Sequence, residues 1–202
     1  MKMPLFVALL LSASSLFAQK YADTIQLNFL YGSVPAKGHY NSEPKLFGGL
    51  KGGHVNIEVN GRVLDFKPGN PCAIVPNNSK PGGGFHLNNG VSWDTASSKW
   101  MTIQIPVTQE QLDGLDSLFT DYAHQTPYDY AVFGMRCAAA SYDVLSEVGI
   151  LKKLSYKNNI LINFYPKLLR KRMLKWAKEN NYSVTFHEGR ASRKWESDEG
   201  FF

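Results

Sequence analysis

The chain has 202 residues, of which 44% are hydrophobic, 13% aromatic and 19% charged, and these fractions are those of a folded globular protein. A formal net charge of +5 is too small by itself to indicate a nucleic-acid-binding protein. No collagen-like period, internal repeat or low-complexity tract is present. A chain of this length forms one domain by default and can bury a core without the help of metal ions.

The N-terminus has the layout of a secretory signal peptide. Residues 1–3 (MKM) are a short basic start, residues 4–17 are apolar apart from serines, and Ala18 is a small residue at the cleavage point. The apolar segment is too short for a permanent membrane span, and no later segment has the roughly 18 consecutive apolar residues that a span needs. We therefore expect a signal peptide over 1–18 and a secreted or periplasmic chain from Gln19 onward.

Positive charge is concentrated toward the C-terminus. From residue 150 onward, twelve Lys or Arg stand against five Asp or Glu, whereas residues 19–149 carry nine against twelve. Such a basic run is most often a solvated helix face, and the alternative is a surface in peripheral contact with anionic envelope polymers or lipid head groups. We expect residues 19–202 to form one domain, with a basic C-terminal extension over about 150–202.

Alternation of polar and apolar residues predicts the strands. The clearest case is the segment 54–66, HVNIEVNGRVLDF, in which Asn60-Gly61 is the preferred dipeptide of a two-residue hairpin turn. Further strands are expected over 23–31, 100–107 and 182–187. The segments 32–53 and 67–90 are rich in Gly and Pro and are expected to be long loops.

Helices are predicted between and after these strands. Thr108 is a good N-cap, because Gln111 follows three residues later and a helical apolar stripe comes after it. A second helix is expected over 135–148, where Gly149 ends it, and a basic third helix over 166–180. Together the elements indicate an α+β fold, with an antiparallel sheet packed against helices.

The hairpin turn determines which polar residues share a face of the sheet. With a two-residue turn, Asn56 pairs with Asp65 and His54 with Lys67, and these side chains project away from the apolar, core-facing side. Asp65 lies diagonally from His54, within reach of a hydrogen bond, and a carboxylate beside an imidazole fixes its tautomer and raises its basicity. The alternative is that these are ordinary polar residues on the wet face of an antiparallel hairpin.

Cys137 lies at the start of the second expected helix, in the sequence GMRCAAAS. The free N–H groups and the dipole of a helix N-terminus stabilise a thiolate, and Arg136 adds positive charge. A thiolate opposite a strand histidine that a third polar group orients is the arrangement of cysteine hydrolases. The other cysteine is Cys72, and a secreted chain with two cysteines often pairs them, so a free thiol and a Cys72–Cys137 disulfide are both open.

The segments GGHVNIEVNGRVLDF and YDYAVFGMRCAAASYDVL together resemble the circularly permuted papain-like hydrolases of the NlpC/P60 superfamily. That group includes the lecithin:retinol acyltransferase-like and YiiX-like proteins. The resemblance covers about 47–66 and 128–149. It implies a permuted papain-like fold and a catalytic triad of His54 on a strand, Asp65 as the polar third member, and Cys137 as the nucleophile that opens a later helix.

At two positions the chain departs from that pattern. Many permuted members have Asn just before the cysteine, where this chain has Arg136, and their third member is often His or Glu rather than Asp65. The resemblance disfavours the Cys72–Cys137 disulfide. It implies a hydrolase that cleaves an amide or ester bond in a cell-envelope substrate, either a peptidoglycan peptide or a lipid acyl bond. Asn56 is the alternative to Asp65 as the residue that orients His54. The competing class of protein is a non-catalytic secreted binding module with a Cys72–Cys137 disulfide.

Other chemistry has little support in the sequence. The remaining histidines lack H-E-x-x-H or any other close ligand spacing, so neither a metal site nor a cofactor is expected. No P-loop or dinucleotide-binding motif is present, since the glycines at 82–84 lead into Phe85 and not into a helix. Trp93 and Trp100 are candidates for a substrate groove, although core packing is the commoner role of such aromatics. No nucleic-acid partner is expected, and the oligomeric state is left open.

Overall fold

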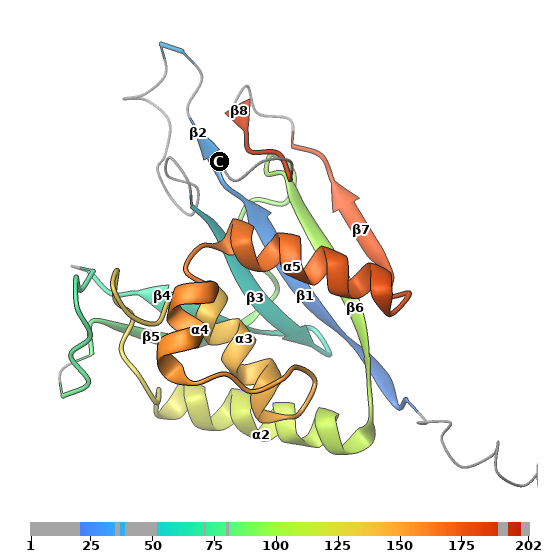
Figure 1. Cartoon of the computed structure of the whole chain (residues 1–202), viewed down its shortest axis with the longest axis horizontal. Helices are drawn as coiled ribbons and strands as arrows, with labels where there is room; N and C mark the ends of the chain where they lie inside the picture. The colour runs from blue at the N-terminus through green and yellow to red at the C-terminus, as the bar shows by residue number, and fades with distance from the viewer. Residues whose placement is uncertain are drawn as a thin grey trace, which may run out of the picture.

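The computed structural model describes residues 21–34, 37–38, 52–70, 72–79, 81–189 and 194–198. The signal peptide expected over 1–18, and most of the loop expected over 32–53, lie outside these residues. The described part is an α+β structure in which a six-stranded antiparallel sheet packs against helices that lie in front of it in Figure 1. The expected fold class is therefore confirmed at this level.

The strands of the large sheet follow the order β5-β4-β3-β1-β6-β7. They are β1 (Asp23–Tyr31), β3 (Gly53–Val59), β4 (Arg62–Pro68), β5 (Gly83–Asn89), β6 (Trp100–Val107) and β7 (Val184–His187). A separate two-stranded sheet pairs β2 (Ser33–Val34) with β8 (Lys194–Trp195). The expected strands over 23–31 and 100–107 are confirmed with their predicted bounds.

The helices of the described part are α2 (Gln109–His124), α3 (Cys137–Glu147), α4 (Tyr156–Ile162) and α5 (Pro166–Glu179). Thr108 caps α2 as predicted, since its side chain accepts from the Gln111 N–H and the Gln111 side chain accepts from the Thr108 N–H. α3 begins two residues later than expected, because Met135 is bridged to Tyr130 before the helix starts. Gly149 follows the helix with φ +71°.

The central hairpin has the predicted register over its first four pairs, from Val59 with Arg62 to Asn56 with Asp65. Asn60 and Gly61 form the turn with φ of +50° and +77°, the positive values that a type I′ turn requires. The expected pairing of His54 with Lys67 is not part of the ladder. Beyond Asp65, β4 pairs with β5 alone, and the first residues of β3 pair with β1 alone. The two strands therefore separate at the end where His54 lies.

The segment 67–90 is not the continuous loop that its Gly and Pro content predicts, because its second half is the strand β5. Its sequence, GGFHLNN, places one buried aromatic residue, Phe85, opposite Phe66 of β4, with ring centroids 4.7 Å apart. β5 lies at the edge of the sheet, where the hydrogen bonds of β4 stabilise a strand of low intrinsic β-propensity. α4 is a further element that was not predicted, and Ser155 accepts a hydrogen bond as its N-cap.

The core lies between the sheet and the helices. α3 packs on β3 and β4, where the small side chains at 138–140 let the helix approach the sheet closely, and α5 packs on β1, β3 and β6. The basic region after residue 150 is part of the same core, since α5 contributes Leu169, Met173 and Ala177 to it. α5 is therefore an amphipathic helix whose charged side chains, Arg170 and Lys167 excepted, are not buried.

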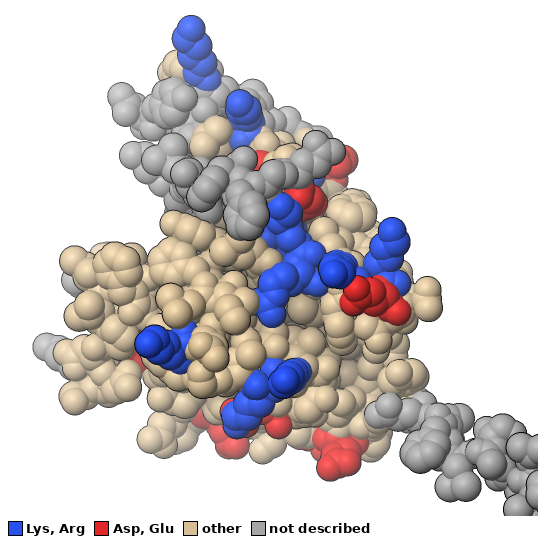
Figure 2. Space-filling view, viewed as in Figure 1, with Lys and Arg blue, Asp and Glu red and all other residues tan. Residues whose placement is uncertain are grey.

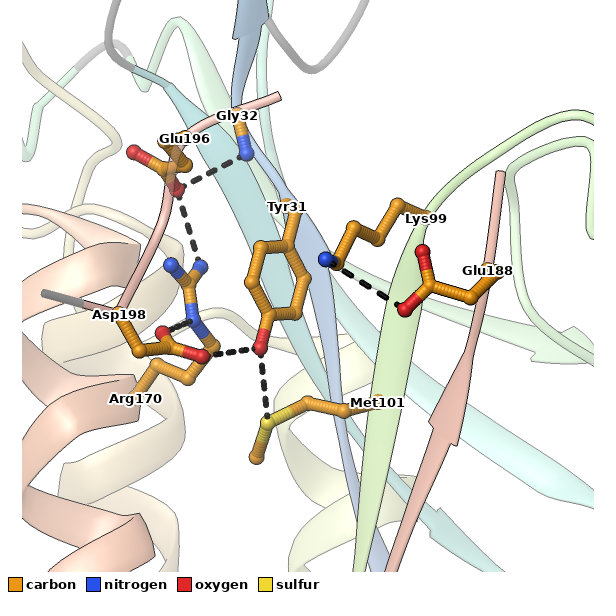
Figure 3. Close-up of polar contacts among 8 residues, drawn as sticks. All are labelled: Tyr31, Gly32, Lys99, Met101, Arg170, Glu188, Glu196 and Asp198. Atoms are coloured by element: carbon orange, nitrogen blue, oxygen red, sulfur yellow. Dashed lines mark hydrogen bonds and ion pairs between the residues drawn. The ribbon is translucent and has the colours of Figure 1, made fainter. Parts of the chain in front are cut away.

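Arg170 of α5 is fully buried and binds the segment around β8 (Figure 3). Its guanidinium donates to Glu196 at 3.0 Å and to Asp198 at 2.7 Å, and it lies 3.6 Å from the centre of the Tyr31 ring. Glu196 also accepts from the Gly32 N–H, which directly follows β1. We call these residues the Arg170 clamp. It fastens a segment near the C-terminus to the end of the central strand.

Candidate active site

Cys137 is the first residue of α3, where helix geometry leaves backbone donors free. Arg136 occupies the N-cap position without a capping side chain, and the first helical hydrogen bond runs from the Ala140 N–H to the Arg136 carbonyl. The N–H groups of Cys137, Ala138 and Ala139 therefore have no acceptor within the helix. These donors and the helix dipole favour negative charge at the sulfur and at any oxygen bound beside it.

His54 and Asp65 form a buried pair on adjacent strands. The Nε2 atom of His54 is hydrogen-bonded to Oδ1 of Asp65, and both side chains are almost entirely buried. The interpretation that these residues lie on a wet face of the hairpin is therefore wrong. Because Nε2 is engaged by the carboxylate, Nδ1 is the ring nitrogen left to interact with another group.

That other group is the thiol of Cys137, which is buried and hydrogen-bonded to the His54 side chain. The sulfur also accepts from the backbone N–H of Val55. These contacts occur where β3 and β4 have separated, so that the Val55 N–H is not used in a ladder with β4. The open end of the hairpin thus brings the start of α3 to the histidine, and the three residues predicted from sequence lie together.

The charges at this site stabilise one another. Burial would raise the pKa of the Cys137 thiol, but the adjacent His54 and Arg136 hold it below its ordinary value. Burial alone would lower the pKa of His54, whereas its interactions with Cys137 and Asp65 raise it above its ordinary value. The two opposite shifts favour a thiolate–imidazolium pair near neutral pH.

The ionised form of Asp65 is stabilised by more groups than the sequence predicts. Although burial opposes its ionisation, the hydrogen bond to His54 and the approach of Ser92 and Lys67 lower its pKa to about 2. The ammonium group of Lys67 lies 2.9 Å from Oδ2. Asp65 is thus a carboxylate at any physiological pH. Its pairing opposite Asn56 was predictable from the turn, but the contribution of Ser92, from the loop after β5, was not.

Trp93 covers the histidine from the side. Its ring stands edge-on to His54, with centroids 6.1 Å apart, and packs in the same way against Trp100, which stacks on His187 at 3.8 Å. Trp93 is buried, so it shields the His54–Asp65 pair from water instead of lining an open groove. Its position could not be read from sequence, because the loop that carries it has no periodic pattern.

Asn56, the alternative orienting residue, has a different place. It is fully buried opposite Asp65, but its side-chain amide has no hydrogen-bond partner among the described residues. Since Nε2 of His54 is bound to Asp65, the orienting position is occupied by the carboxylate.

Both cysteines are free thiols in the structure. Cys72 is exposed, and its Sγ donates to the carbonyl of Ala73. Burial raises the pKa of the Cys72 thiol, in the opposite direction to that of Cys137. The two thiols therefore differ in both exposure and acidity.

Neither a metal site nor a membrane span is found in the part of the chain that the structure describes. No group of three or more His, Cys, Asp or Glu side chains there is arranged to hold a metal ion. None of the helices in the same residues is long and apolar enough to cross a membrane.

Comparison with known proteins finds no counterpart: no family model, no curated protein and no solved structure matches the chain. Any functional assignment therefore depends on the site itself.

Proposed function

We propose that the chain is a thiol hydrolase with a permuted papain-like arrangement, in which Cys137, His54 and Asp65 act as nucleophile, acid–base and orienting residue. One observation carries the proposal: a buried thiol at a helix start is hydrogen-bonded to a histidine whose other nitrogen is held by a buried carboxylate. Structural cysteines need no such partners, whereas an activated nucleophile requires them.

The geometry supports the following sequence of steps. The Cys137 thiolate attacks the carbonyl carbon of an amide or ester, and the oxyanion that forms accepts from free N–H groups at the start of α3. The imidazolium of His54 then donates its proton to the leaving amine or alcohol, so that the carbon–heteroatom bond breaks and an acyl-enzyme remains. Neutral His54 next takes a proton from water, which attacks the thioester and releases the carboxylic acid.

Asp65 keeps the ring in the tautomer and orientation that these proton transfers need. None of the steps uses a metal or an organic cofactor. For the substrate, we propose an amide or ester of the cell envelope, a peptidoglycan peptide or a lipid acyl bond, met by a secreted or periplasmic chain. This part of the proposal is supported by the signal-peptide pattern and the resemblance described above.

The experiment that tests the proposal is alkylation of the full chain by iodoacetamide as a function of pH, read by peptide mass spectrometry. Because the pKa of Cys137 is lowered and that of Cys72 is raised, Cys137 should be labelled first and should still react near pH 6. His54→Ala removes the group that lowers the thiol pKa, so the low-pH reactivity should disappear.

Asp116→Asn, a change of an exposed carboxylate on α2, is the matched control and should leave the pH profile unchanged. Labelling of Cys137 only above about pH 8, with no effect of His54→Ala, would show an inert thiol. A count of free thiols in the unreduced chain addresses the competing proposal, a secreted binding module with a Cys72–Cys137 disulfide. That proposal requires the count to be zero.

A further inference from the structure

Large apolar side chains that face solvent are concentrated beside Cys137. Among the described residues, six of the ten exposed ones lie in three short segments, 74–75, 132–133 and 161–162, of which the second precedes α3 and the third belongs to α4, packed on α3. We call this set the apolar rim, and its members are Ile74, Val75, Val132, Phe133, Leu161 and Ile162. Ile74, Val75 and Phe133 are each more than 60% exposed, at 66%, 62% and 65%. Contiguous exposed apolar surface of this kind marks an interaction site more often than single exposed residues do.

The first four members of the apolar rim are held together by backbone hydrogen bonds. The N–H of Val132 donates to the Ala73 carbonyl and that of Phe133 to the Ile74 carbonyl, both at 2.9 Å. The buried carboxylate of Asp129 accepts from two backbone N–H groups, those of Asn77 and Gly82, and so fixes the partner loop. The exposed side chains are therefore presented on an ordered support and do not lie on a free loop.

The other two members belong to the last turn of α4, which packs on α3. The Asn159 side chain donates to the Ala139 carbonyl at 2.9 Å, next to the nucleophile. Arg136, the N-cap residue of α3, connects the start of this helix to α4, because its guanidinium stacks on Phe164 and Tyr165, just after α4. The rim thus lies on segments that adjoin α3, since residues 132–133 precede it closely in the chain and α4 packs on it.

Positive charge accompanies this apolar surface. Residues 156–179, which include α4 and α5, carry seven Lys or Arg, of which five are not buried, and a single acidic residue, Glu179. In Figure 2, Lys and Arg side chains lie over α4 and α5, beside the mostly uncharged lobe at the left that the loops of Figure 1 form. Apolar side chains that project next to a cationic surface suit a lipid bilayer with anionic head groups, which buries the first and attracts the second.

We propose that the apolar rim docks the chain on an anionic lipid surface. Phe133 and Ile74 would enter the boundary between head groups and acyl chains, and Lys157 of α4 would lie at the head-group level. The start of α3, which carries Cys137, would then lie on the bilayer side of the molecule, where an acyl ester of a lipid is at hand as substrate. The docking proposal depends only on this surface, whereas the delivery of a lipid substrate to Cys137 rests on the hydrolase function proposed above.

The test is flotation of the full chain with phosphatidylglycerol-containing vesicles and with pure phosphatidylcholine vesicles. We expect binding to the anionic vesicles that weakens as salt is raised. Because each buried apolar side chain is worth about tenfold or more in affinity, the double variant Ile74→Ser/Phe133→Ser should bind about a hundredfold more weakly. Phe186→Ser is the matched control, since Phe186 is also exposed but lies on β7 at the far edge of the sheet, and it should bind like the unmodified chain.

A second pair of variants tests the charge. Lys157→Glu on α4 should weaken binding more than Lys178→Glu near the end of α5, although both change an exposed lysine in the same way. Equal binding of the rim variant and the unmodified chain, or no binding to either vesicle, would overturn docking. Self-association of the unmodified chain in sedimentation velocity that the rim variant loses, without flotation, would identify a second copy as the occupant and also overturn it.

The hydrolase proposal and the docking proposal can be refuted independently of each other. Alkylation of Cys137 near pH 6, measured without vesicles, should be the same in the rim variant and in the unmodified chain, since neither substituted residue contacts the thiol. No flotation of the unmodified chain, with normal alkylation of its Cys137, refutes the docking surface alone. Normal flotation with an inert Cys137 refutes the hydrolase alone.

Discussion

Asp65 influences the charge state of the candidate site through His54. Its carboxylate holds His54, and His54 in turn holds the thiolate of Cys137. The shield that Trp93 forms over this pair keeps its interactions in a medium of low dielectric constant. A single carboxylate thus acts on the sulfur through the imidazole ring, without touching it.

The lowered pKa of Asp65 predicts a specific acid dependence of stability. The folded value, about 2, lies below the unfolded value of about 3.9, so the contribution is present above pH 4 and is lost as pH falls through 2. It amounts to about 2 kcal/mol of unfolding free energy. In urea titrations between pH 5 and pH 2, Asp65→Asn should reduce the slope of stability against pH. A slope identical to that of the unmodified chain would contradict the lowered pKa.

Among the elements, β3 begins at a residue that leaves no room for a side chain. Gly53 has φ +96°, and a Cβ added to it would lie 2.5 Å from the Leu30 carbonyl oxygen of the neighbouring strand. Only glycine allows β1 and β3 to approach this closely directly before the histidine. The position of His54 along the sheet is therefore set by the residue in front of it.

This constraint is tested by two alanine substitutions at positive φ. Gly61→Ala in the hairpin turn meets no atom within 4 Å, so only backbone strain of about 1 kcal/mol is expected. Gly53→Ala adds a clash with backbone and should lose about 3 kcal/mol or more of unfolding free energy. Urea unfolding measures both, and equal losses would show that the close approach to Leu30 does not matter.

Much of the sheet could be predicted because its strands carry their own signal. β1 and β6 alternate cleanly, and the Asn60-Gly61 turn determined the register that brings Asp65 beside His54. β5 escaped prediction because its pairing depends on the hydrogen bonds of β4 and not on its own residues. The ladder also ends at the pair of Asn56 with Asp65, before the predicted pair of His54 with Lys67, and this separation, which local pattern does not encode, leaves the end of β3 that carries His54 free of β4.

The site residues followed a similar rule. His54, Asp65 and Cys137 could be found because each sits at a position defined locally, by a turn or by a helix start. Trp93, by contrast, belongs to a loop whose course is decided by packing on distant strands. The apolar rim also has no signature in sequence, since exposed and buried isoleucines look the same until the fold is known.

For the molecule as a whole, the Arg170 clamp joins three regions that are far apart in the sequence. Arg170 is completely buried, and its two carboxylate partners are partly shielded. Removal of one partner from a buried ion pair leaves the others unsatisfied, and this usually costs more than the pair itself contributes. The clamp therefore holds Tyr31 and Gly32 at the end of β1 in place. Because β1 pairs with β3 and β6, it also stabilises these two strands.

Arg170→Met should lower the free energy of unfolding by about 3 kcal/mol, since the shielded Glu196 and Asp198 lose their cation. Lys175→Met is the matched control on the same helix. Its ion pair with Glu179 is exposed, so a change below about 0.5 kcal/mol is expected. Urea denaturation of the two variants provides the comparison, and equal effects would show that the clamp is dispensable.

The clamp also has a consequence for the order in which the chain matures. Glu196 and the Gly32 N–H that it accepts from are 164 positions apart. A ribosome delivers the chain from its N-terminus, so β1, β3 and α3 emerge well before their fastening segment is made. We expect the end of β1, which pairs with the strand of His54, to lack these contacts throughout synthesis until residues 194–198 have been added. Full reactivity of the thiol would then be the last property that a newly made molecule acquires.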